Sequence, residues 1–472
     1  MRLCVAGGVV LAALAAGCAA RAAGPAEAFG EELVVRRLGD GKVLQHFEFA
    51  VEREATAEDQ HNYRLFPRQI GEIAQRHAVR SLQLAFTQGN WREQWGYAPA
   101  PVHGAGAELL ARIAAPAENA TQQWRGLANA LSGVFCASLN FIDETNTDSP
   151  GMGAGPAGLR RGRLPRENVC TENLTPWIKQ LPCQAKSGLG ALLNPHRLFN
   201  AHFYSMGVSL ETAPASGGGR PALRYTQHLT VVLDPRAFGL ADDGGGGGGG
   251  WTLGALMDRP LLAAACPVAS RSTVRVTGFR ATPRPDSAAA ISDDAAAVTH
   301  TFDLLRRRID DIGLSAEPAR NESLAGPVVS VHRYVTGSGG IDGGVEAILT
   351  NRHAAPVRVT YLDSLPWYLR VYSHTLQVRT AAGKALRPAR VAFSPAVDRG
   401  RPSSLAVELE LPPASRTVVR FAFEKGFLKY TEHPPDANRG FNVAPAVVSY
   451  TLPGAEPACP RPTFPCRTTS SR

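Results

Sequence analysis

The chain has 472 residues, of which 44% are hydrophobic and 19% are charged, which is the composition of a globular protein with room for two or three domains. Its formal net charge is +9, but the basic residues are scattered along the chain and form one short run over 306–308. Nucleic-acid binding requires a basic face interleaved with aromatic side chains, which this sequence lacks, so we interpret the run as the solvated surface of a short helix.

Residues 1–22 have the pattern of a signal peptide. A charged start at Arg2 precedes an apolar core over 5–14, and Ala-Arg-Ala over 20–22 supplies a cleavage site. The segment ending at Cys18 also resembles a bacterial lipoprotein box, which is the competing interpretation. Farther along, no stretch approaches the roughly 20 apolar residues of a membrane-spanning helix. We therefore expect a soluble mature chain unless a partner holds it at a membrane.

Cysteine usage indicates an oxidising compartment. Cys4 and Cys18 would leave with the signal peptide, so six of the eight cysteines would remain. They are widely spaced and form no CxxC pair, so we predict neither a metal ion nor a cofactor. The six are Cys136, Cys170, Cys183, Cys266, Cys459 and Cys466.

Three N-x-S/T sequons, at Asn119, Asn173 and Asn321, are candidate N-glycosylation sites of a luminal protein. Asn173 is the weakest of the three because Pro176 follows Thr175.

Strand-like patterns extend over most of the chain. Phe47, Phe49 and Val51 alternate with less apolar residues, which is the two-residue period of a strand with one buried face. Because polar residues occupy the other face, we expect mainly antiparallel sheets. Similar stretches occur over 229–233, 274–276, 357–361, 405–411 and 419–423.

Helical spacing is confined to the first half of the chain. Trp124, Leu127 and Leu131 fall on one face of a helix, and Ile70 and Ile73 suggest a short helix after a proline. These apolar stripes are interpreted as core.

Two low-complexity segments punctuate the sequence. The glycines over 244–250 lack the Gly-Lys-Ser/Thr of a phosphate-binding loop and predict a flexible loop insertion. The segment 282–297, rich in Ala, Pro, Ser and Asp, predicts an exposed loop or domain boundary.

We therefore predict a mainly β fold with a few helices, a β-rich α+β class, arranged as two tandem β-sandwich-like luminal domains. The first covers 23–281 and carries the helices, a linker covers 282–300, the second domain covers 301–450, and 451–472 form an atypical disordered tail.

A search for catalytic motifs finds neither Gly-x-Ser-x-Gly nor His-Glu-x-x-His. The histidines, such as His61, His228, His332 and His374, occur singly, which is typical of surface or satisfied core residues. Cys136 has apolar neighbours, which would raise a thiol pKa and predict a buried structural role rather than a nucleophile. The sequence thus favours a binding or scaffold protein, with a cryptic hydrolase as the remaining enzyme hypothesis.

Several stretches resemble the PIG-T family, the luminal subunit of the GPI transamidase, and they follow the family's order from about Glu31 to about Tyr450. They are HNYRLFP over 61–67, LAFTQGNW over 84–91, LSGVFCASLNFID over 131–143, LPRENVCTENLTPW over 164–177, LPC over 181–183, LPWYLR over 365–370 and FLKYTE over 427–432.

The resemblance implies a non-catalytic subunit of an endoplasmic-reticulum complex. That complex cuts a C-terminal signal from a proprotein and joins the new carboxyl end to a GPI lipid, and a separate caspase-like protease subunit, PIG-K, does the cutting. The other membrane subunits would be further partners. Because the family's membrane-spanning helix has no counterpart here, we expect the chain to be held at the luminal side of the membrane by the complex.

The resemblance also places an interchain disulfide to PIG-K at Cys170. An internal bridge from Cys170 to Cys183 or Cys266 is the alternative. Cys136, Cys183 and Cys266 are the candidates for intrachain pairing. An independent secreted β-sandwich binding module is the competing function, and it predicts a monomer without a covalent partner.

Overall fold

We describe the protein from a computed structural model, which covers residues 27–54, 63–149, 158–213, 222–240, 250–261, 265–291, 294–316, 326–337, 339–433, 436, 438, 440–452 and 469–470. The predicted signal peptide, the glycine run up to Gly249, His61, Asn321, Cys459 and Cys466 lie outside these residues.

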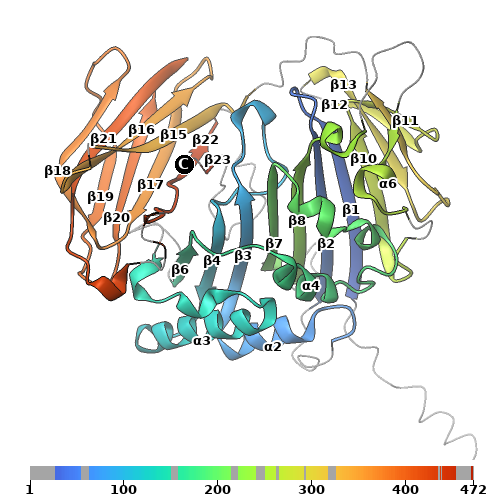
Figure 1. The fold of residues 1–472 in the computed structure, drawn as a ribbon, viewed down its shortest axis with the longest axis horizontal. Helices are drawn as coiled ribbons and strands as arrows, with labels where there is room; N and C mark the ends of the chain where they lie inside the picture. Colours follow the sequence, from blue (N-terminus) through green and yellow to red (C-terminus); the bar gives the residue numbers. More distant parts are fainter. Residues whose placement is uncertain are drawn as a thin grey trace, which may run out of the picture.

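An eleven-stranded sheet forms the larger part of the molecule (Figure 1). Neighbouring strands run antiparallel, except that β1 and β10 are parallel. In spatial order the strands are β12 (Ser287–Ile291), β13 (Asp294–Asp303), β10 (Ala269–Thr277), β1 (Glu27–Arg37), β2 (Val43–Glu54), β8 (Ala222–Leu233), β7 (Phe203–Ala213), β3 (Val79–Gly89), β4 (Gly106–Ile113), β6 (Leu159–Leu164) and β5 (Thr147–Asp148).

The centre of this sheet confirms the predicted alternation. Phe47 of β2 lies opposite Leu33 of β1 and Leu229 of β8, and all three side chains are buried. A register slip of one residue would turn this apolar set to the other face, so the pattern specifies the pairing.

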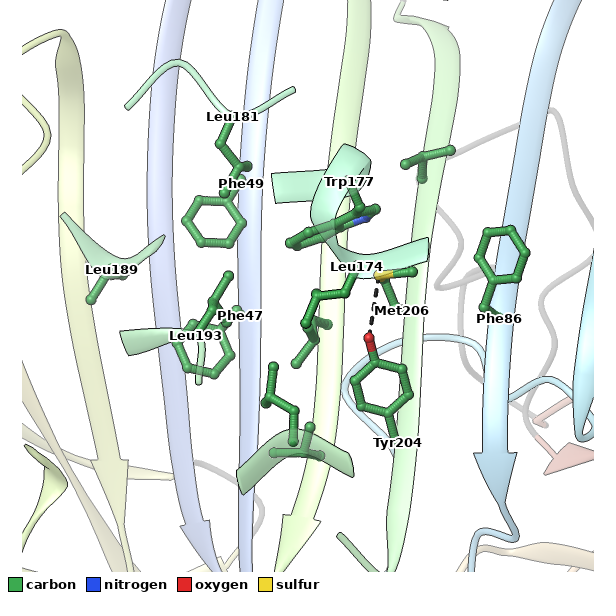
Figure 2. Close-up of a cluster of buried hydrophobic side chains, with 14 of the residues drawn as sticks. Phe47, Phe49, Phe86, Leu174, Trp177, Leu181, Leu189, Leu193, Tyr204 and Met206 are labelled. Atoms are coloured by element: carbon green, nitrogen blue, oxygen red, sulfur yellow. Dashed lines mark hydrogen bonds between the residues drawn. The ribbon is translucent and has the colours of Figure 1, made fainter. Parts of the chain in front are cut away.

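Helices cover one face of the sheet. α2 (Arg68–Arg76), α3 (Ala117–Phe135), α4 (Thr171–Lys179) and α5 (Pro195–Phe199) supply apolar side chains to the core. Trp177 of α4 packs edge-on against Phe49 (Figure 2), with ring centroids 6.1 Å apart. Its indole N–H donates to the Gly207 carbonyl at 3.0 Å. The stripe from Trp124 to Leu131 in α3 is buried, as predicted. Because a buried side chain of this size contributes about 1.5–3 kcal/mol, these helices are firmly anchored.

The structure corrects the prediction of a linker over 282–300. Most of it forms β12 and β13, which pair with each other and, through β13, with β10. Low-complexity composition did not prevent strand formation, because pairing satisfies the backbone groups whatever the side chains are. A three-stranded sheet of β11 (Phe279–Thr282), β14 (Gly313–Ala316) and β9 (Trp251–Thr252) shares the first hydrophobic core, which ends at Leu314.

The second hydrophobic core runs from Val329 to Val448 between two facing sheets. The four-stranded sheet contains β15 (Val329–Thr336), β16 (Asp342–Asn351), β21 (Ser415–Lys425) and β18 (Leu369–Thr380). The five-stranded sheet contains β19 (Arg390–Ser394), β20 (Ser403–Leu411), β17 (Val357–Leu365), β22 (Val447–Thr451) and β23 (Thr469–Ser470). The predicted fold class, mainly β with a few helices, is confirmed.

The predicted disordered tail over 451–472 needs a partial correction. Thr451 belongs to β22 and pairs with Arg358, and the two residues of β23 pair with Val447 and Val448. The remaining tail residues other than Leu452 lie outside the described part of the chain. In the part of the chain that is described, none of the helices combines the length and the apolar character needed to cross a bilayer.

Candidate functional site at Cys170

Cys170 is the residue that precedes α4, and its thiol is free and partly exposed. Its carbonyl accepts hydrogen bonds from the backbone N–H groups of Asn173 and Leu174, both at 3.2 Å, which starts the helix. One turn later, Leu174 and Trp177 are buried against the sheet. The thiol is therefore carried at the exposed start of a helix whose opposite face is fixed in the core.

The side chain of Asn173 ties this helix start to the end of α3. Its Nδ2 donates to the carbonyls of Phe135 and Cys136 at 3.1 and 2.9 Å, and its Oδ1 accepts from the Cys170 N–H at 3.0 Å. The last carbonyls of a helix have no partner within the helix, and Asn173 satisfies two of them. With 1% of its surface exposed, Asn173 has no room for a glycan in the folded chain, which corrects the weakest of the three glycosylation predictions.

A second tie holds the loop before Cys170. The Ser138 N–H, in the short 3₁₀ helix η2 (Ser138–Phe141), donates to Glu167 Oε1 at 2.7 Å. Beneath the site, burial raises the pKa of Tyr204 far above its usual value, with a smaller contribution from the neighbouring Cys170. The Tyr204 hydroxyl donates to Met206 Sδ at 3.3 Å (Figure 2). Cys170 therefore lies next to a buried, packed region of the sheet.

Cys136 is exposed, and this corrects the prediction of a buried structural residue. It ends α3 in the left-handed conformation, with φ 50° and ψ 47°, while Phe135 and Ala137 on either side are buried. The apolar neighbours take the core positions, and the left-handed turn directs Cys136 away from them. Cys136 is also a free thiol.

Cys183 and Cys266 form a disulfide, with Cα atoms 5.8 Å apart and a sequence separation of 83. This pairing removes both alternative internal partners of Cys170. Next to the bridge, buried Glu31 accepts hydrogen bonds from the Cys266 N–H, the Leu189 N–H and the Ser272 hydroxyl at 3.3, 3.0 and 2.7 Å. Burial raises the pKa of Glu31, although these three donors oppose the effect.

Of the other predicted site residues, Asn119 is exposed in the first turn of α3, where a glycan would meet solvent. His332 lies 3.1 Å from Glu93 across the boundary between the two cores. In the described ranges of the chain, no three His, Cys, Asp or Glu side chains gather in a way that could hold a metal ion.

Buried arginines at the boundary between the two cores were missed by the sequence analysis. Arg161 binds Asp148 through two hydrogen bonds of 3.0 and 2.7 Å, and Arg163 binds Asp148 and the Pro445 carbonyl at 3.1 and 3.0 Å. Burial alone would raise the pKa of Asp148, but the two guanidinium groups outweigh it and hold that pKa below its usual value. The available signal was the spacing of Arg161 and Arg163, which puts both on one face of β6.

A groove of about 650 Å³ lies beside this ion cluster. One wall comes from the loop 164–167 that leads to Cys170, and the other comes from the second sandwich. Its aromatic lining residues are Phe141, Trp367, Tyr368 and Phe441.

Comparisons with known proteins agree with this description. A family model, Gpi16 subunit, GPI transamidase component, matches residues 11–242 and 250–470. The GPI-anchor transamidase component PIGT of Mus musculus is 37% identical over 490 aligned residues, covering 96% of this chain and 81% of that protein. PIGT of Homo sapiens is 37% identical over 470 residues, covering 92% and 79%. The GPI transamidase component GPI16 of Saccharomyces cerevisiae is 31% identical over 492 residues, covering 89% and 79%. The resemblance found in the sequence is thus confirmed, and the chain belongs to the Gpi16 family of GPI transamidase components.

Proposed function

We propose that this chain is a non-catalytic subunit of the GPI transamidase, acting on the luminal side of the endoplasmic-reticulum membrane. It stabilises the caspase-like protease subunit, PIG-K, to which Cys170 links it by a disulfide. The complex then joins proprotein carboxyl ends to GPI lipid, and this chain supplies no catalytic residue to the reaction.

The observation that carries the proposal is the arrangement of the cysteines. Cys183 and Cys266 are bonded to each other, whereas Cys170 is free, partly exposed and held by Asn173 at the start of an anchored helix. A thiol whose backbone is fixed loses little conformational freedom when it forms an interchain bond, so the covalent link costs little ordering entropy.

A covalent link of this kind keeps the partner at a high effective concentration and in one orientation. Loss of the link should therefore weaken assembly and lower transamidation without abolishing the chemistry, because the catalytic residues lie on the other subunit. A scaffold role needs a rigid platform, and the large sheet on which α4 packs provides one.

The test is a non-reducing gel of membranes from cells that lack their own copy and express the full chain, probed for the protease subunit. We expect a reducible heterodimer that is lost in Cys170→Ser. Cys136→Ser is the matched control, because Cys136 is the other free thiol of the described residues and is more exposed than Cys170. A heterodimer that persists in Cys170→Ser, or a secreted monomer in every lane, would refute the proposed disulfide between Cys170 and the protease subunit.

A further inference from the structure

Two exposed aromatic side chains line the groove between the two domains, and two more lie within five residues of Glu432, which also lines it. Phe141 is 67% exposed, Phe427 88%, Tyr430 94% and Phe441 37%. Phe141 and Phe441 line the groove itself, and Glu432, two residues after Tyr430, also lines it. Phe141 belongs to the N-terminal part of the chain and the other three to the C-terminal part, and residues of both parts line this groove. Apolar groups gathered at a hollow on the surface mark an interaction site.

Tyr430 lies on a braced segment of the chain. Arg399 holds both carboxylate oxygens of Glu432, and its guanidinium lies 4.8 Å from the ring centre of Trp367. Glu432 in turn accepts from the Lys429 N–H at 2.7 Å, which closes the short 3₁₀ helix η7 (Tyr430–Glu432). Tyr430 is therefore displayed toward solvent from an ordered backbone.

The groove also offers an unused hydrogen-bond donor. Arg166 lines it, and the Nη2 atom of Arg166 is buried without a hydrogen-bond partner in the described part of the chain. Arg166 and Tyr368 both line the groove, where burial raises the pKa of Tyr368 to about 12 and the charge of Arg166 opposes this rise. An oxygen acceptor entering the groove would satisfy Arg166.

The groove lies close to Cys170. Glu167 lines the groove and lies three residues before Cys170, so the two Cα atoms are at most about 10 Å apart. A protein interface of ordinary size covers about 800 Å² on each partner, which corresponds to a patch of about 16 Å radius. A protein bonded to Cys170 through such an interface therefore reaches the groove.

We propose that this groove and its exposed aromatic side chains form a second, non-covalent contact with the same protein that is disulfide-linked at Cys170. The partner places an apolar side chain between Phe141 and Phe441 and an oxygen acceptor at Arg166. The inference rests on the proposed function, and it adds that the protease subunit bridges both domains of this chain.

The first test replaces Phe141 or Tyr430 by a benzophenone amino acid in the full chain, in cells that lack their own copy, and resolves the irradiated membranes on a reducing gel. We expect an adduct with the protease subunit at both positions. Leu305, 46% exposed, is the matched control position and should give none. An adduct with a different polypeptide only, or no adduct, would overturn the proposal.

The second test measures how much protease subunit co-purifies in a Cys170→Ser background. We expect Phe141→Ser with Tyr430→Ser to lower retention at least tenfold, and Leu305→Ser with Val268→Ser, at two other exposed apolar positions, to leave it unchanged. Both aromatic side chains are exposed, and formation of the Cys183–Cys266 bridge checks that each variant folds. Unchanged retention in the aromatic variant would contradict the groove contact, while the Cys170 gel reports on the covalent link separately.

Discussion

Replacing Asn173 with alanine removes three hydrogen bonds, two that join the end of α3 to the start of α4 and one within the start of α4. They connect Asn173 to Phe135, Cys136 and Cys170 over 2.9 to 3.1 Å, in a site that is almost fully buried. At about 1 kcal/mol for each bond, the free energy of unfolding should fall by about 3 kcal/mol. Two carbonyls also lose their partner, so this value is a lower bound for a site that admits no water.

The assay is urea unfolding of the purified full chain, combined with the non-reducing gel for the interchain bond. We expect Asn173→Ala to lose stability and to give less heterodimer, because the Cys170 backbone is no longer held. Thr175→Ala is the matched control, since it destroys the same sequon while leaving the Asn173 side chain in place. The Thr175 hydroxyl donates only to Thr171 within α4, and its loss should cost less than about 1 kcal/mol.

Two results would refute this reasoning. One is an equal loss of stability in Thr175→Ala and Asn173→Ala, which would make the sequon responsible. The other is a glycan on Asn173 of the folded protein, detected by mass spectrometry, because the Asn173 Nδ2 atom that would carry it donates hydrogen bonds to two carbonyls.

Three further outcomes are expected. Cys183→Ser should lower the free energy of unfolding by up to about 4.5 kcal/mol, the chain-entropy value for a loop closed across 83 residues, and an unchanged thermal midpoint would contradict it. Burial lowers the pKa of His46 from 6.5 to about 4, so the unfolded chain binds a proton first and stability is lost as pH falls from 6.5 toward 4. At pH 5 this loss is about 2 kcal/mol relative to neutral pH, and His46→Gln should remove it from the pH profile of urea unfolding. Asp148→Asn removes the carboxylate that is bonded to Arg161 and Arg163 and should cost about 3–5 kcal/mol in the same assay, and a loss below 1 kcal/mol would show that water or the remaining carboxylates compensate the two arginines.

Some errors of the sequence analysis share a cause. The segment 282–300 was assigned to a linker from composition, and Cys136 was assigned to the core from its neighbours. In both cases the local sequence does not reveal the neighbouring strand or the backbone conformation that decides the outcome. β12 and β13 form because β10 offers an edge to pair with, and Cys136 faces solvent because α3 turns left-handed at that residue.

The amino-acid sequence by itself determined the family, the β-rich class, the alternation in β2 and the apolar stripe of α3. These features follow from motifs and from side-chain periods of 2 and 3.6 residues, which are local properties of the chain. It also placed Cys170 at the centre of the candidate site, through the stretch over 164–177.

Only the tertiary structure decided which groups meet. A disulfide requires Cα atoms within about 7 Å, and a separation of 83 residues does not indicate that Cys183 and Cys266 satisfy this condition. The same holds for Asn173, whose sequon suggested a glycan, but whose amide lies between the ends of two helices that are 35 residues apart, from Phe135 to Cys170. Long-range contacts depend on how the sheet brings its connections together, and that arrangement makes Cys170 a fixed and accessible thiol.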